Sequence, residues 1–169
     1  MLNLLQARHA RRRFVEQLRD RLVARAREKV FFQEIAVPDT IDGRFDLVVL
    51  HVWMVLERLR EAAMEDVAQA LTDEIFVSFD DALREQGTGD IGIGKRMKAM
   101  ASAFHGRLKA YGQADDVAAL ELALARNIFR GSAGDATALA RYVLSARGAL
   151  AACAVEKGGL DFGPLPVVR

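Results

Sequence analysis

The most apolar stretch of the chain runs from residue 47 to residue 56, where His51 is the only polar residue. A helix with apolar residues at nearly every position is apolar all round, so other helices must enclose it. A membrane-spanning helix needs about 20 apolar residues, whereas charged residues from Glu57 onward end this run after about half that length. The pattern therefore predicts a buried central helix over residues 42–60 that is not a membrane anchor.

The segment before this helix contains the signals of a turn followed by a helix start. Pro38 fixes the turn, and Asp39, Thr40 and Asp42 are each suitable N-cap residues. The sequence leaves open which of the three caps the helix.

Other segments repeat apolar residues at steps of three and four, the spacing of amphipathic helices. In the N-terminal segment these residues are Leu4, Leu5, Phe14, Leu18, Leu22 and Val23. Further helices are predicted over about residues 64–86, 95–112, 114–130 and 135–156, while 30–35 is helical or irregular. Gly112 is expected to cap its helix in a left-handed conformation. Because no alternating pattern predicts a sheet, we expect an all-α fold: a single compact bundle of about six or seven helices around a buried central helix.

The domain organisation follows from the same patterns. The chain has 169 residues, about the length of one domain. We expect a single helical domain over residues 1–169, with a basic amphipathic arm over 1–29, a helical core over 30–157 and an extended tail over 158–169. The start of the chain lacks a secretory signal pattern, which predicts a cytoplasmic protein.

A glycine-rich connector from Gly87 to Gly94 separates two predicted helices. Its glycine spacing matches nucleotide-binding loops, but such loops follow a strand, and a phosphate loop has Ser or Thr where Arg96 follows Lys95. A simpler anion site remains, because the helix start after the connector would present free N–H groups beside Lys95, Arg96 and Lys98. The alternative is that the connector only sets the angle between two helices.

The helix after the connector has an apolar stripe that includes Met97, Met100 and Phe104. Most such residues belong to a core. Beside Lys95 and Arg96, however, these three would form an adaptable apolar groove with a cationic rim, suited to holding a helix of a membrane protein.

The N-terminal arm has nine basic and three acidic residues between positions 2 and 29. One interpretation is a peripheral helix with a solvated charged face. The other is a docking surface for anionic lipid headgroups or ribosomal RNA, for which Arg8, Arg11, Arg12 and Arg13 are the candidates.

Composition and spacing argue against most other functions. The net charge is +1, which gives no reason to expect specific DNA binding. The single cysteine, Cys153, excludes an internal disulfide and is expected to be an inert buried thiol. His9, His51 and His105 lack the partners at helical spacing that a metal site needs, and no Cys-x-x-Cys-His haem motif occurs. No nucleophile has an apparent base, so we expect no catalytic residue, metal or cofactor, and no enzyme activity.

Two blocks of the sequence, VPDTIDGRFDLVVLHVWMVLERL and LTDEIFVSFDDALREQGTGDIGIGKRMKAMASAFHGRLKAY, resemble the ubiquinol–cytochrome c chaperone family over about residues 30–150. The resemblance implies an assembly chaperone that binds cytochrome b, newly made or in its apo form, and promotes its maturation into the cytochrome bc1 complex. It implies a location at the periphery of the inner membrane. It also implies that a small partner assembly factor and the ribosome are possible partners, as is an anionic membrane surface.

The family's most recognisable motif falls on LREQGTGDIGIGKRMK. The resemblance therefore makes this region the candidate surface for the client or another partner, with the candidate residues Gly87, Gly89, Asp90, Lys95, Arg96, Met97, Lys98, Met100 and Phe104. Two other hypotheses remain: a peripheral membrane or scaffold module that binds anionic lipid without a bc1 client, and a small-molecule or haem-binding enzyme.

Overall fold

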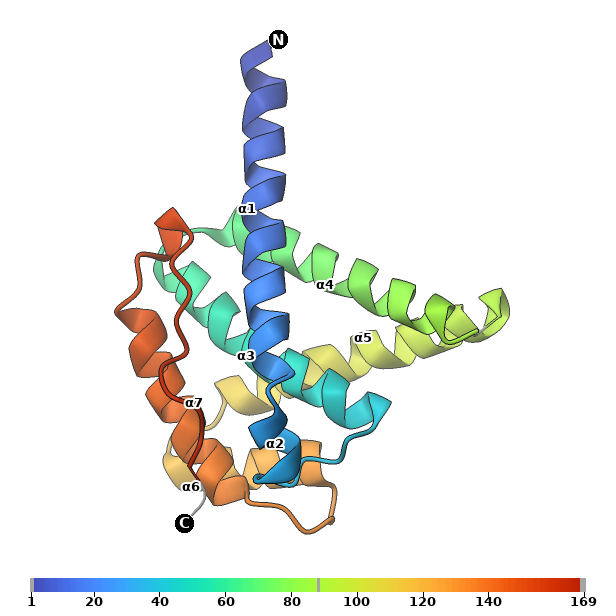
Figure 1. Ribbon diagram of the computed structural model, residues 1–169, viewed down its shortest axis with the longest axis vertical. Helices are drawn as coiled ribbons and strands as arrows, with labels where there is room; N and C mark the ends of the chain where they lie inside the picture. Colours follow the sequence, from blue (N-terminus) through green and yellow to red (C-terminus); the bar gives the residue numbers. More distant parts are fainter. Residues whose placement is uncertain (1, 88, 168–169) are drawn as a thin grey trace.

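The computed structural model describes residues 2–87 and 89–167, without the side chains of residues 2–5, 90 and 91. These residues form helices and connecting turns, with no strand among them, which confirms the all-α prediction (Figure 1). The elements in chain order are α1 (Leu2–Ala26), α2 (Lys29–Gln33), α3 (Ile41–Glu61), α4 (Glu65–Glu85), α5 (Asp90–Gly112), α6 (Val117–Leu124), the π-helical turn η1 (Ala125–Phe129), α7 (Ala136–Ala151) and the 3-10 turn η2 (Val155–Lys157).

Helix α3 is the centre of the bundle, as its apolar run predicts. Every residue from Phe45 to Leu56 is buried, on all sides of the helix. Helices α1, α4, α5 and α7 and the turn η1 all pack against α3 (Figure 1). Burial of this one helix therefore holds the surrounding elements together.

The turn before α3 is fixed by a close backbone approach. Among the three possible caps the structure uses Thr40, whose Oγ1 accepts a hydrogen bond from the Gly43 N–H at 3.1 Å. A Cβ atom at position 43 would lie 1.9 Å from the carbonyl oxygen of Pro38. Glycine is therefore required here, and the turn places the first residues of α3 in a defined position.

The glycine connector is shorter than its composition predicts. Among the described residues of the connector, only Gly87 has a left-handed conformation, with φ +75°, and α5 begins at Asp90, so Gly92 and Gly94 lie inside that helix. Both are exposed, while Ile93 between them is buried. Burying Ile93 favours the helix and offsets the roughly 1 kcal/mol that each helical glycine costs. The prediction that α5 starts at Lys95 was wrong.

One helix cap and one helix end also differ from the prediction. Helix α5 ends at Gly112 as predicted, but Gly112 does not have a positive φ, so it is not a left-handed cap. Helix α7 ends at Ala151 and not near Glu156. The chain turns there and places Val155 of η2 in the core, and burial of this apolar side chain stabilises the turn.

The C-terminal tail packs against the body of the protein. It runs back along α7 (Figure 1), and the buried Phe162 lies against His51 of α3 with ring centroids 5.2 Å apart. The guanidinium of Arg25 in α1 donates hydrogen bonds to the carbonyl oxygens of Gly163 and Pro164 at 2.7 and 2.9 Å. The tail thus connects the first helix to the last.

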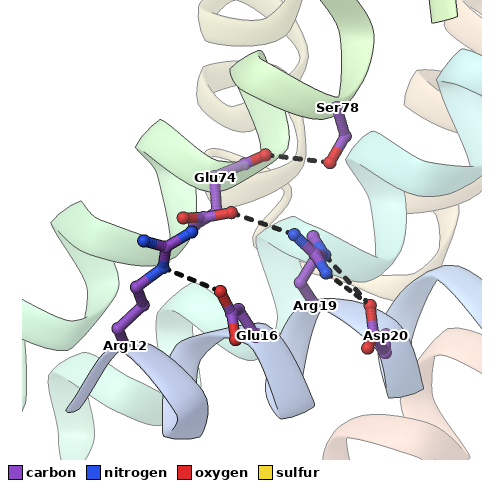
Figure 2. A network of polar contacts seen from close by, with 6 residues as sticks. All are labelled: Arg12, Glu16, Arg19, Asp20, Glu74 and Ser78. Carbon is purple, nitrogen blue, oxygen red and sulfur yellow. Dashed lines mark hydrogen bonds and ion pairs between the residues drawn. The ribbon is translucent and has the colours of Figure 1, made fainter. Parts of the chain in front are cut away.

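Helix α1 packs with its second half and projects with its first. Val15, Leu18 and Leu22 are buried, whereas residues 6–13 are exposed and extend beyond the other helices (Figure 1). The side chains of Leu4 and Leu5 lie outside the described residues. The packed half is joined to α4 by Arg19, which donates to Glu74 at 2.9 Å and to Asp20 at 2.8 Å (Figure 2).

Candidate functional site

The surface is hollowed where the start of α3, the second half of α4 and the first half of α5 meet. The larger hollow, here called the apolar groove, has a volume of about 840 Å³. Six large apolar side chains form much of its wall: Ile41, Phe45, Val48, Phe79, Leu83 and Met100. Arg27, Arg44, Asp39, Thr40, Ala82, Glu85 and Gln86 complete its lining.

A smaller hollow of about 260 Å³, here called the arginine pocket, adjoins this groove. The two share Ile41, Phe45, Leu83 and Met100. The rest of the pocket is lined by Asp42, Arg96, Ala99, Ala103, Arg107 and Arg130. The combined site is an apolar surface with guanidinium groups at one end, and Ile41 at its edge is 46% exposed.

Behind the pocket, a buried carboxylate holds two of its arginines. Asp46 in α3 is fully buried, and its Oδ2 accepts a hydrogen bond from Arg130 Nη2 at 2.5 Å. Its Oδ1 lies 2.7 Å from Arg107 Nε in an ion pair, although the N–H is not aligned for a hydrogen bond. Arg107 also stacks over the Phe45 ring at 5.2 Å. Asp46 thereby ties α3 to α5 and to the end of η1.

The electrostatics of this cluster reflect its burial. Burial raises the pKa of Asp46 to about 6, because the loss of water outweighs the attraction of Arg107 and Arg130 for the charged form. Burial and the charge of Asp46 also raise the pKa of Tyr111, well above its usual value. The carboxylate is therefore ionised at neutral pH, but only by a margin of about one pH unit.

Arg130 reaches the pocket from an unusual backbone conformation. Its φ of +50° is in the left-handed region, where a residue with a side chain is rare, and it ends the π-helical turn η1. The sequence predicts one regular helix over residues 114–130, whereas α6 stops at Leu124 and η1 follows. This change directs the Arg130 guanidinium toward Asp46, where its side chain remains 43% exposed.

Two of the predicted contact residues lie in the site and one lies in the core. Arg96 lines the arginine pocket, and Met100 lines both hollows. Phe104 is buried, with its ring 5.1 Å from that of Phe76, so it supports the groove from within and does not reach a partner. Lys95 and Lys98 are exposed on α5, and Met97 is half-buried.

The glycine motif itself does not form the predicted anion site. Because α5 starts at Asp90, its free N–H groups lie in the turn that begins there, one turn or more before Lys95 and Lys98. Gly87 and Gly89 form the exposed turn between α4 and α5. The backbone of Asp90 is helical, and its side chain is outside the described residues.

The predicted docking arginines occupy the projecting half of α1. Arg8, Arg11, Arg12 and Arg13 are all exposed. Two of them already have partners on the protein: Arg11 pairs with Asp66 at 3.1 Å, and Arg12 pairs with Glu16 at 2.8 Å (Figure 2). In the part of the chain that the structure describes, no helix combines the length and apolarity needed to cross a bilayer.

His51 is a core residue with both ring nitrogens engaged. Nδ1 donates to the Leu47 carbonyl oxygen at 2.7 Å, and Nε2 accepts from the Tyr142 hydroxyl at 2.8 Å. The Tyr142 oxygen in turn accepts from Arg25 Nε at 3.0 Å. Complete burial lowers the pKa of His51 to about 4, so the ring is neutral. It therefore has no free nitrogen for a metal or haem.

The other candidate ligands for a metal ion that the structure describes do not form a metal site. Among the described residues, no three or more His, Cys, Asp or Glu side chains gather closely enough to hold a metal ion. Cys153 is half-buried rather than buried, with its sulfur 3.3 Å from the Ala149 carbonyl oxygen.

Sequence reasoning missed Asp46, Arg107 and Arg130. Two of these lie within predicted helices, and the third ends one, with no local pattern that predicts a binding or catalytic role for them. The available signal was the position of Asp46 at the edge of the most apolar run: a carboxylate in an enclosed helix requires a cation from another segment. The sequence does not say which of its arginines provides it.

Comparisons with known proteins agree with this architecture. A family model described as ubiquinol-cytochrome C chaperone matches residues 33–157. The fold is similar to the crystal structure of the Cbp3 homolog from Brucella abortus, with a TM-score of 0.80 and 34% sequence identity over 98% of this chain and 99% of that chain. No match was found among the curated proteins that were compared. The resemblance read from the two sequence blocks is confirmed, and the chain belongs to the ubiquinol–cytochrome c chaperone family.

Proposed function

We propose that this protein binds newly made cytochrome b and promotes its assembly into the cytochrome bc1 complex, without catalysing a reaction. The observation that supports this most is the apolar groove: a member of this chaperone family presents Ile41, Phe79 and Met100 on an open surface beside arginine side chains. An unassembled membrane protein exposes apolar side chains that need such a surface.

The size of the groove suits reversible binding. Burying one leucine or phenylalanine side chain contributes about 1.5–3 kcal/mol, and a hollow of about 840 Å³ accommodates only a few such side chains. Because association and ordering oppose this gain, we expect micromolar or weaker affinity. With such an affinity, the apolar surface of the client is covered reversibly, and the client dissociates when its permanent partners in the complex bind it.

Deletion of the gene tests this function. We expect a deletion strain to lose assembled bc1 complex, measured by native gel electrophoresis and by the cytochrome b signal in reduced-minus-oxidised spectra. Unchanged cytochrome b and bc1 content would reject the proposal.

Complementation of the deletion strain then tests the groove. We expect wild-type protein to restore the complex and Ile41→Glu, which places a charge at the groove, to fail. Leu122→Glu is the matched control, since Leu122 is an even more exposed leucine on α6 that lines neither hollow.

We also propose that the projecting half of α1 docks on an anionic membrane surface. Arg8 and Arg13 carry this prediction, because Arg11 and Arg12 are already paired with carboxylates. Clustered arginines near anionic lipid contribute about 1 kcal/mol each. In a flotation assay with vesicles of anionic and neutral phospholipid, Arg8→Glu with Arg13→Glu should reduce binding, whereas Arg60→Glu at the end of α3 should not. Equal flotation of all variants would remove this surface from the account.

A further inference from the structure

The arginine pocket carries a net positive charge, whereas the charges that line the adjoining apolar groove balance. Arg96, Arg107 and Arg130 line it, while Asp42 lines it and Asp46 lies directly behind. Three guanidinium groups against two carboxylates leave one positive charge. In the adjoining apolar groove, by contrast, Arg27 and Arg44 face Asp39 and Glu85, and Arg44 is paired with Asp39 at 2.7 Å.

The same cluster contains buried polar atoms that lack directed hydrogen bonds. Asp46 Oδ1 and Arg107 Nε lie 2.7 Å apart but are not aligned. The hydroxyl of Tyr111, also buried, has no hydrogen-bond partner in the described part of the protein, and it is near enough to Asp46, Arg107 and Arg130 to respond to their charges. Buried polar groups in native proteins are nearly always satisfied. These exceptions lie behind the pocket, because Asp46 and Tyr111 are not among its lining residues, and they leave the guanidinium groups that do line it incompletely neutralised.

The backbone at Arg130 places one of the pocket's guanidinium groups. A non-glycine residue at φ +50° is held in a sparsely populated conformation, which costs about 1 kcal/mol or more. Despite its bond to Asp46, the Arg130 side chain is 43% exposed, so part of its guanidinium still faces the pocket and solvent. Arg130 therefore presents N–H donors of its guanidinium to the arginine pocket, in addition to its bond with Asp46.

The shape of the site limits the ligand. The pocket shares Ile41, Phe45, Leu83 and Met100 with the apolar groove, so whatever brings an anion into the pocket also brings apolar groups into the groove. A single net positive charge matches a monoanion better than a phosphate, which carries up to two negative charges. Arginine donors at the end of an apolar surface thus fit a carboxylate on an otherwise apolar peptide segment.

From this we infer that the arginine pocket recognises a Glu or Asp side chain, or a terminal carboxylate, within an apolar segment of the partner chain, and that Arg96 and Arg130 donate to it. The inference rests on the proposed function in taking the partner to be the client, and it adds a chemical selectivity. Apolar segments without a carboxylate would bind more weakly and would not be fixed in register along the groove.

A pair of peptides tests this selectivity on the full-length protein. Two labelled peptides of about 20 residues are identical amphipathic helices, apolar on one face, except that one has a central Glu on that face where the other has Gln. We expect the Glu peptide to bind about tenfold more tightly than the Gln peptide, as measured by fluorescence anisotropy, because it gains about one charge-assisted hydrogen bond. Arg96→Gln should reduce this preference, and Arg96→Gln with Arg130→Gly should abolish it.

Folding of the variants is checked separately from binding. Arg96 is exposed, and glycine adopts the backbone conformation of position 130 without strain, but Arg130→Gly also removes a hydrogen bond of the buried Asp46. Arg60→Gln, an exposed arginine at the far end of α3, should leave the preference unchanged. Circular dichroism confirms that each variant is folded before binding is measured.

Three results would overturn the inference: equal affinity for the two peptides, no binding of either peptide, or a preference that survives loss of both arginines. Vesicles of anionic phospholipid that displace the Glu peptide from wild type and bind the double variant more weakly than wild type would also overturn it, and would assign the pocket to a lipid headgroup. In each of these cases the bc1 deletion phenotype still decides the proposed function separately, because it does not depend on peptide charge.

Discussion

The neutral His51 predicts a specific acid sensitivity of the fold. Its pKa is about 4 in the folded protein and 6.5 when the ring is in water. Between these values the unfolded chain binds a proton that the folded chain does not bind. The stability contributed by the neutral ring is therefore fully present above pH 6.5 and is lost progressively as the pH falls toward 4.

The two pKa values set the size of the effect. From pH 7 to pH 5, proton binding by His51 in the unfolded chain lowers the free energy of unfolding by about 2 kcal/mol. Asp46 acts in the opposite direction over part of this range, because its pKa is raised. The pH dependence of wild type alone is therefore ambiguous, and the difference between wild type and His51→Gln is the quantity to measure.

Urea unfolding at pH 7, 6 and 5 provides this measurement, with fluorescence of the buried and only tryptophan, Trp53, as the signal. Glutamine retains an acceptor for the Tyr142 hydroxyl but does not titrate. We expect the stability advantage of wild type over His51→Gln to shrink by about 2 kcal/mol from pH 7 to pH 5. His105→Gln, at an exposed position on α5, is the control and should follow wild type. An advantage that does not change with pH would show that the ring is not held neutral by burial.

Three other predictions test separate parts of the structure. Gly43→Ala should lower the free energy of unfolding by about 3 kcal/mol, because its Cβ would meet the Pro38 oxygen. The control Gly94→Ala, in open space on α5, should instead raise the free energy of unfolding by about 0.5–1 kcal/mol. Equal effects of the two variants in urea unfolding would contradict the close approach. Arg25→Gln should speed hydrogen exchange in residues 158–167 more than elsewhere, because Arg25 holds the carbonyl oxygens of Gly163 and Pro164; unchanged exchange in the tail would show that Phe162 alone anchors it. The Asp46 carboxyl should titrate near pH 6 in carbon-detected NMR, so its contribution to stability is greatest below pH 3.8 and is lost as the pH rises through 6; a midpoint at or below 3.8 would mean that Arg107 and Arg130 fully offset its burial.

The buried centre of the fold could be predicted from the sequence because it depends on local composition. The run from Leu47 to Leu56 admits only an enclosed helix, and the lone His51 within it had to find its partners inside the core. The three possible caps before α3 could not be ranked. The choice of Thr40 depends on how closely the Gly43 backbone approaches Pro38, which is a property of the folded turn.

The start of α5 differs from the prediction because burial of one side chain outweighs the low helix propensity of two glycines. Gly92 and Gly94 weaken a helix, but Ile93 between them gains a buried position only if the helix includes it. That gain depends on the packing of α5 against its neighbours, which no local pattern contains.

The candidate site was predicted only in part. Met100 belongs to the apolar stripe of α5 and Arg96 is a basic residue beside that stripe, so both could be predicted from one helix. Asp46, Arg107 and Arg130 come from separate elements, and Arg130 reaches the cluster through a π-helical turn and a left-handed residue. Neither feature has a clear sequence signature, so the arginine pocket became apparent only from the folded protein.

The central claim, that the groove between α3, α4 and α5 holds newly made cytochrome b, is tested most directly by crosslinking. A photoreactive amino acid replaces Ala99, which lines the arginine pocket, or Leu122 on α6, which lines neither hollow, and cytochrome b is translated in the presence of each protein. We predict a crosslink to cytochrome b from position 99 and none from position 122. Crosslinks of equal yield from both positions, or from position 122 alone, would contradict the account.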